Sequence, residues 1–206
     1  YAWSLVLTGA NPRQRVITML KRHPNNSKIV YAGTAQGLKV SDDGGETWGK
    51  VTHRLTEANH ILWMEFGIND PNTIFVGLTG GAIRSRDGGK TFTRVFVRPW
   101  PRLSYVRVVR PDPREKGWVW LGTYDGLLVS KDGGDNFKRM GGLLFTGHRI
   151  SRIVFGDTPG RLFVSTERDL WTSSDNGETW EFVHFGSKSW YMEAMMKDSR
   201  SRDSLL

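Results

Sequence analysis

The sequence predicts an all-β fold, a β-propeller of four-stranded antiparallel blades, and three observations lead to this prediction. The pattern Ser-x-Asp-x-Gly-x-(Thr/Asn)-(Trp/Phe) occurs four times in the chain. Its aspartates are Asp43, Asp87, Asp132 and Asp175, which are 44, 45 and 43 residues apart, close to the roughly 40 to 50 residues of a propeller blade. Short β-rich runs flank every copy, and no stretch shows a convincing amphipathic helical period.

The flanking runs predict where the blades and their strands lie. Four blades are expected at about 14–51, 59–95, 104–140 and 149–183, with partial blades at 1–8 and 189–206, all within one domain covering 1–206. First strands are expected at 16–20, 61–66, 105–109 and 150–155, and second strands at 29–33, 74–77, 118–122 and 162–165. Third strands are expected at 37–40, 82–84, 126–129 and 170–172, and each fourth strand at the Trp or Phe that closes the pattern.

The two partial blades leave two arrangements open. The N-terminal strand could join the C-terminal strands and close a small five-bladed ring without free edges. Alternatively, the chain is a contiguous piece of a longer propeller. We favour the second arrangement because the composite blade would lack a third strand and its turn.

The repeated pattern is expected to form the turn between the third and fourth strands of each blade. An Asp side chain can accept hydrogen bonds from the amides of its own turn, Gly supplies positive φ, and hydroxyl groups add local bonds. No copy has the alternating oxygen ligands and terminal Glu of a calcium loop. We therefore expect structural roles for Ser41, Asp43, Gly45, Trp48, Ser85, Asp87, Gly89, Phe92, Ser130, Asp132, Gly134, Phe137, Ser173, Asp175, Gly177 and Trp180.

Composition excludes several classes of protein. The chain has 206 residues, of which 38% are hydrophobic and nine are Trp, so it can bury a core and is not expected to be disordered. It has no Cys, which excludes disulfides, thiolate zinc sites and a cysteine nucleophile. No apolar stretch reaches the ~18 to 20 residues of a spanning helix. The net charge of +8 favours an acidic partner.

The four turns and their flanks resemble the Asp-box, or BNR, repeats of sialidase-type β-propellers, and the resemblance covers nearly the whole chain. The segment 28–51 is most similar to the photosystem II stability/assembly factor group, and it is also similar to the repeats of xyloglucanase-type hydrolases and sortilin-type receptors. The assembly factors would imply seven blades and an arginine-rich face for a client membrane protein. The repeat specifies the fold strongly and the function weakly, because one scaffold hosts many functions.

Functional residues are expected on the loops opposite the repeated turns, where binding groups of propellers usually lie. Basic and aromatic side chains dominate there, and residues 84–116 hold ten Lys or Arg against three acidic residues. The plain alternative is a solvated surface, with Arg84 and Arg86 pointing outward and Arg94 protecting a strand edge. The partner-binding candidates are Arg98, Trp100, Arg102, Arg107 and Arg110, together with Arg54, Arg149 and Arg168.

The sequence gives less support to an enzymatic or metal-dependent function. The Phe/Tyr-Arg-Ile-Pro motif that the sialidase resemblance would imply is missing from the chain. A xyloglucanase needs two opposed carboxylates, for which the loops offer Glu57, Asp125, Glu167 and Asp169; Glu65 and Glu193 are expected to line a channel. His53, His60, His148 and His184 lie on separate loops without the short spacing of metal ligands.

These observations together predict a non-catalytic protein-interaction or assembly module, associated with a membrane-protein complex such as a photosynthetic or respiratory assembly. The expected partner is an acidic protein surface. We expect no cofactor, no metal and no membrane span, and we rank nucleic acid below protein because no nucleic-acid module is present. The resemblance implies an extracytoplasmic location. The alternative is a glycan-binding or glycoside-hydrolysing propeller of the sialidase or xyloglucanase type.

Overall fold

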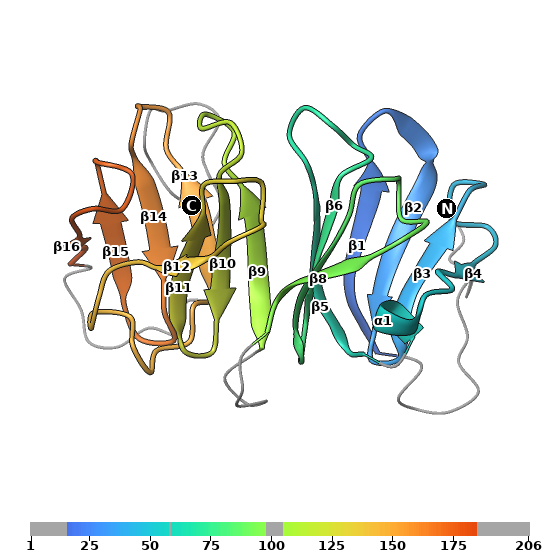
Figure 1. The fold of residues 1–206 in the computed structure, drawn as a ribbon, viewed down its shortest axis with the longest axis horizontal. Helices are drawn as coiled ribbons and strands as arrows, with labels where there is room; N and C mark the ends of the chain where they lie inside the picture. The colour runs from blue at the N-terminus through green and yellow to red at the C-terminus, as the bar shows by residue number, and fades with distance from the viewer. Residues whose placement is uncertain (1–15, 58, 98–104, 185–206) are drawn as a thin grey trace, which may run out of the picture. The chain divides into compact units, whose positions relative to one another are not determined.

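The computed structural model describes residues 16–57, 59–97 and 105–184. In these ranges the chain forms four antiparallel sheets of four strands each and one four-residue helix, which confirms the all-β prediction (Figure 1). The chain divides into two compact units, Tyr1–Val109 and Arg110–Leu206. Among the described residues, no helix combines the length and the apolar character needed to cross a membrane.

The first unit contains two complete sheets. One sheet has the strand order β1 (Ile17–His23), β2 (Asn26–Thr34), β3 (Gly37–Ser41) and β4 (Gly49–Lys50). The other has the order β5 (Ile61–Phe66), β6 (Ile74–Leu78), β7 (Gly81–Ser85) and β8 (Thr93–Phe96). The helix α1 (Arg54–Glu57) connects them between β4 and β5.

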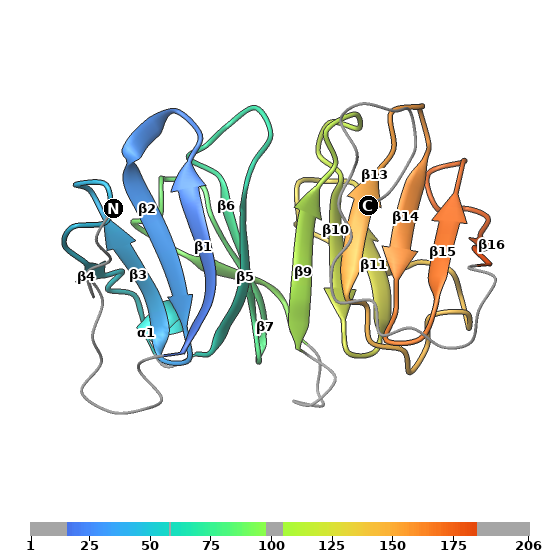
Figure 2. The same ribbon diagram turned by 180° about the vertical axis from the view of Figure 1, so that it is seen from behind.

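The remaining strands form two further sheets (Figure 2). The third sheet has the order β9 (Val106–Pro111), β10 (Val119–Thr123), β11 (Gly126–Ser130) and β12 (Lys138–Arg139), and β9 crosses the boundary between the two units. The fourth sheet has the order β13 (Arg152–Phe155), β14 (Leu162–Ser165), β15 (Leu170–Ser173) and β16 (Glu181–Phe182). Each strand is therefore paired with the strand that precedes or follows it in the chain.

The four repeated turns, at residues 41–48, 85–92, 130–137 and 173–180, lie beside the connections between first and second strands. One backbone hydrogen bond recurs in every sheet: Gly44 N to Lys28 O at 2.8 Å, Gly88 N to Asn72 O at 2.9 Å, Gly133 N to Gly117 O at 2.7 Å, and Asn176 N to Gly160 O at 3.0 Å. We call this end of each sheet the repeat-turn end. The opposite, loop end carries the turns between second and third strands and the connections between sheets.

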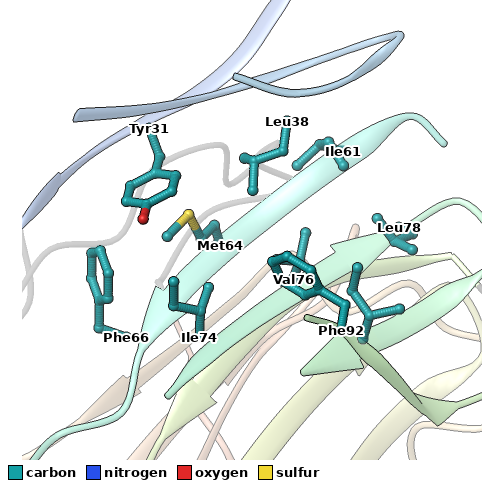
Figure 3. Packing of buried hydrophobic residues seen from close by; sticks show 10 residues of the cluster. Tyr31, Leu38, Ile61, Met64, Phe66, Ile74, Val76, Leu78 and Phe92 are labelled. Carbon is teal, nitrogen blue, oxygen red and sulfur yellow. The ribbon is translucent and has the colours of Figure 1, made fainter. Parts of the chain in front are cut away.

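The core of the first unit lies between its two sheets. Tyr31 of β2 and Leu38 of β3 pack against Ile61 and Met64 of β5 (Figure 3). All five residues of β6 are buried, whereas β5 has both buried and half-buried positions. Burying one such aliphatic or aromatic side chain stabilises a fold by about 1.5–3 kcal/mol, so contact between these sheets is the main source of stability in this unit.

The structure differs from the sequence-based expectation at the helix and at the outer strands. The short helix α1 was not predicted; its Thr56 carbonyl lies 2.6 Å from where a Cβ on Gly37 would stand, so the helix is fixed against the β2–β3 turn. Fourth strands begin after the aromatic residue rather than at it. In two of the four turns the aromatic residue is held inside the turn, because the indole N–H groups of Trp48 and Trp180 donate to Gly45 O and Gly177 O.

Arg84 is buried, contrary to the solvated-surface alternative, in which it points outward. Its relative exposure is 6%, while Arg86 and Arg94 are exposed. All five residues of β7 are buried, so both faces of this third strand are covered. Residues of a strand alternate between buried and exposed only where one face of the sheet is solvated. The expectation for Arg84 assumed such a face, and a strand buried on both sides has none.

Candidate functional site

The candidate site lies at the loop end of the second unit, where three segments come together. These segments are the β10–β11 turn at 124–125, the β12–β13 connection at 140–151 and the β14–β15 turn at 166–169. Ile150 N donates to Thr123 O at 2.9 Å and Ser151 N donates to Ser165 O at 2.8 Å. These backbone bonds fix the end of the long connection between the two turns.

Asp125 anchors the β12–β13 connection to the β10–β11 turn. Its Oδ2 atom is 2.6 Å from Nη2 of Arg139, and Nη1 of the same arginine donates to the Asp125 carbonyl at 2.7 Å. Gly147 N donates to Oδ1 of Asp125 at 3.1 Å. Arg139 thus bonds both the carboxylate and the backbone carbonyl of Asp125, and the second carboxylate oxygen holds Gly147, so Asp125 connects these loops.

Glu167 performs the corresponding task between the β12–β13 connection and the β14–β15 turn. Its Oε2 atom accepts a hydrogen bond from Arg149 N at 2.8 Å, and its Oε1 atom is 3.2 Å from Nδ1 of His148. Partial burial opposes ionisation. Hydrogen bonds from its own backbone amide, from His148 and from the Arg149 amide outweigh that effect, so the pKa of Glu167 is lowered.

The surface that these anchors support is aromatic and basic. The Arg149 guanidinium carbon is 5.8 Å from the ring centroid of Tyr124, a cation–π distance, and both side chains are partly exposed. Arg168 is exposed at the tip of the β14–β15 turn, where its amide donates to Thr166 Oγ1 at 3.1 Å. An aromatic face bordered by fixed hydrogen-bond donors suits a ligand with both apolar faces and polar edges.

The four predicted carboxylate candidates for hydrolysis are distributed differently. Asp125 and Glu167 are both engaged in loop anchoring. Asp169 is half-buried in the same turn as Glu167, and Glu57 is exposed on α1 in the first unit. A general acid needs a carboxyl whose pKa is raised, whereas that of Glu167 is lowered.

The predicted partner-binding arginines occupy several places. Arg149 and Arg168 lie at the loop end of the second unit, and Arg54 is exposed on α1. Arg107 and Arg110 are half-buried on β9, with the Arg110 guanidinium carbon 5.8 Å from the Phe155 ring. Arg98, Trp100 and Arg102 fall outside the described residues.

The repeated turns share one hydrogen-bond arrangement. In each, the Ser hydroxyl donates to the Asp carboxylate at 2.6–2.7 Å, and the Gly amide donates to the Ser oxygen at 2.8 Å. At Asp175, hydrogen bonds from the Thr179 side chain and backbone and from Ser173 lower the pKa to about 2. The described part of the chain contains no group of three or more His, Asp or Glu side chains placed to hold a metal ion.

Sequence reasoning did not find Arg139 or Gly147 as part of the loop-end site. Arg139 lies 14 residues from Asp125, and the two meet only because β11 and β12 pair across the intervening turn. A weaker signal was present in the threonines at the ends of second strands. Thr34 and Thr123 each donate to a glycine carbonyl three residues later, at 2.8 and 2.9 Å, which shapes the turns at the loop end.

No family model matches the chain. Curated relatives include a xyloglucanase from a Paenibacillus species, 28% identical and matching 76% of this chain and 19% of the relative. A xyloglucanase from Hypocrea jecorina is 25% identical over 95% of this chain and 23% of the relative. The chain thus spans about a fifth of the length of these relatives.

Solved structures resemble the chain at lower sequence identity. An ancestral GH74 enzyme matches 84% of this chain and 26% of that chain, with a TM-score of 0.69 and 20% identity. The extracellular domain of a one component system from B. thetaiotaomicron matches 85% and 22%, with a TM-score of 0.62 and 16% identity. YCF48 from Cyanidioschyzon merolae matches 91% and 61%, with a TM-score of 0.63 and 17% identity. The predicted β-propeller fold is confirmed.

The comparisons correct the functional prediction. The expectation of a non-catalytic assembly module for a membrane-protein complex is wrong, because the relatives found by sequence are named as xyloglucanases. At 17% identity the likeness to YCF48 concerns the fold alone. The repeated turns predict the fold, and a fold alone does not discriminate among functions.

Proposed function

We propose that this chain is a glycan-binding propeller segment of the xyloglucanase type, and that its ligand is xyloglucan or a closely related glucan. The observation that carries this proposal is its sequence similarity to xyloglucanases from a bacterium and a fungus, over 76% and 95% of the chain. Likeness in fold to GH74 enzymes supports it.

The loop end of the second unit supplies suitable chemistry for such a ligand. One face of a glucose ring carries C–H groups that can rest on the Tyr124 ring, while hydroxyl groups at the ring edge can accept hydrogen bonds from Arg149 and Arg168. A neutral glycan requires no net charge at its site, so specificity here comes from shape and hydrogen bonding. Asp125 and Glu167 contribute by fixing the loops that carry these groups.

Hydrolysis is not assigned to the carboxylates of this site. Glycoside cleavage uses one carboxyl as acid and a second as base or nucleophile, and Asp125 and Glu167 are occupied by loop contacts. The proposed contribution of this chain is to hold the polymer. An extracytoplasmic location is part of the proposal, since a polysaccharide of this kind is met outside the cell and one structural neighbour is an extracellular domain.

The test is a binding titration of the full chain with xyloglucan oligosaccharides by calorimetry. Tyr124→Ala removes the apolar ring face and should weaken binding by about tenfold, roughly 1.4 kcal/mol, and Tyr124→Phe should retain most of the affinity. Trp118→Ala is the matched control, because Trp118 is also a partly exposed aromatic residue next to a cation but lies near the repeat-turn end. Its ring centroid is 4.1 Å from Lys131 Nζ. Equal loss in both alanine variants would remove Tyr124 from the proposed site.

A further inference from the structure

Asn176 occupies a backbone conformation that glycine adopts in the other three repeat turns. Its φ is 58°, and the corresponding residues Gly44, Gly88 and Gly133 have φ of 89°, 72° and 74°. Among the described residues, Asn176 is the one non-glycine residue with positive φ. Asn is among the few side chains that visit this region at modest cost, so the position is strained but tolerated.

The Asn176 side chain has one hydrogen-bonded end and one unbonded end. Its Nδ2 atom donates to Oε1 of Glu115 at 3.3 Å, which connects the β15–β16 turn to the β9–β10 turn. Its Oδ1 atom is buried and has no hydrogen-bond partner. The side-chain amide is therefore held in place mainly from its nitrogen.

Gly177 follows Asn176, and this dipeptide has a specific chemical liability. Glycine has no side chain to shield its backbone nitrogen from the neighbouring Cγ. A Cβ at this position would lie 2.9 Å from a ring carbon of Trp120, so no larger residue fits without a rearrangement. Packing thus requires glycine at the position that makes the preceding asparagine reactive.

We propose that Asn176 is a site of spontaneous deamidation in the folded protein. The backbone nitrogen of Gly177 loses its proton and forms a bond to Cγ of Asn176, and the bond from Cγ to Nδ2 breaks with release of ammonia. Water then opens the resulting succinimide ring to give aspartate or isoaspartate. These two reaction steps involve no oxidation or reduction, and solvent water is the co-reactant.

One hydrogen bond restrains this reaction. The Gly177 amide donates to Ser173 Oγ at 2.8 Å, and the bond must break before the nitrogen can attack. Ser173→Ala removes the acceptor, so it should increase the deamidation rate. Asn176→Gly restores the residue found in the other turns and removes the reactive amide.

Deamidation also changes the contact with Glu115. A carboxylate at position 176 replaces the donor that faces Glu115, so an attractive hydrogen bond becomes repulsion between two acids. The β15–β16 turn then loses this hydrogen bond to the β9–β10 turn. The modification would act as a slow, irreversible loosening of this part of the second unit.

The rate test uses the full chain in mildly alkaline buffer, with peptide mapping over time. The tryptic peptide 169–188 should accumulate acidic products, whereas the peptide 132–138, which contains Asn136, should not. A urea-unfolded sample shows that the assay detects conversion at Asn176. The proposal is overturned if Asn176 stays intact in the folded chain while the unfolded chain converts, or if Ser173→Ala is no faster than the parent.

The consequence is tested with permanent substitutions. Asn176→Asp should lower the melting temperature more than Asn176→Gly, which removes the contact without adding charge. Glu115→Gln should restore most of the difference in the Asp background. An Asn176→Asp variant as stable as Asn176→Gly would contradict the role assigned to the Glu115 contact.

Discussion

At the scale of single residues, the four turn aspartates are held by their own turns. Each accepts hydrogen bonds from a Ser hydroxyl and from backbone and side-chain groups four residues later. These donors favour the ionised carboxylate, so the pKa of Asp43, Asp87, Asp132 and Asp175 is lowered. We propose that their role is to hold the turns, as the sequence pattern predicts.

The lowered pKa values predict acid sensitivity of these turns. A carboxylate whose pKa falls on folding contributes stability above its unfolded pKa and loses that contribution as pH falls toward its folded pKa. For Asp175 the window runs from the ordinary value of 3.8 down to about 2. Urea unfolding across this window should show falling stability in the parent and a shallower fall in Asp175→Asn. Identical pH dependence in both proteins would contradict the assignment.

Substitutions at two glycines of the first unit, Gly44 and Gly81, compare the cost of backbone strain alone with the cost of strain plus a steric clash. Gly44 and Gly81 both have positive φ, but a Cβ on Gly44 meets nothing within 4 Å, whereas one on Gly81 collides with the Phe96 carbonyl. Gly44→Ala should cost about 1–2 kcal/mol, the strain of positive φ alone. Gly81→Ala should cost several times more, because it also disrupts the β7–β8 pairing. Chemical denaturation of the two variants gives the comparison, and similar losses would contradict it.

At the scale of elements, the loops of the second unit depend on two buried or half-buried acids. Asp125 and Glu167 connect three chain segments at the loop end. The strands beneath them supply the frame, with fully buried residues such as Trp120, Leu121 and Leu127. Order in the loops therefore rests on these polar contacts together with the packing of fully buried Phe145 against Trp171 and Trp180, whereas order in the strands rests on packing.

Removing the Asp125 side chain should loosen the β12–β13 connection. Asp125→Ala leaves half-buried Arg139 without its carboxylate partner, which should cost about 1–3 kcal/mol and increase amide hydrogen exchange across residues 140–149. Asp169→Ala is the matched control, because the contacts assigned to Asp169 involve its backbone. Equal exchange in the two variants would show that Asp125 is not the anchor.

The strands and repeated turns could be predicted from sequence because their information is local. Short β-rich runs and an eight-residue turn pattern recur at a nearly constant interval, and most strand ends match to within two or three residues. The loop-end network could not be predicted in the same way. Asp125 contacts Arg139 and Gly147, and no local pattern encodes pairs that meet only after the sheets have formed.

Buried Arg84 shows the same limit within a strand. Its neighbours in sequence suggested a solvated face, but burial of a third strand depends on what packs over both sides. The helix α1 is too short for periodicity to reveal it. Function is harder to predict, because the turn pattern that identifies the fold does not lie in the loops proposed to bind a ligand.

At the scale of the whole molecule, net charge and sequence relationship suggested different partners. The charge of +8 favours an acidic protein surface as the partner. The relatives found by sequence are named xyloglucanases, which favours a glycan. These alternatives respond differently to salt. Contacts between a basic patch and an acidic protein weaken as ionic strength rises, while stacking and hydrogen bonding to a neutral glycan should change little.

The most direct test of the proposed function is a calorimetric titration of the full chain with xyloglucan oligosaccharides at low and at high salt. Cello-oligosaccharides and sialylated glycans serve as comparison ligands. We predict saturable binding of xyloglucan with nearly equal affinity at both salt concentrations, and weaker binding of the comparison ligands. Failure to bind any of these glycans at either salt concentration would contradict the account.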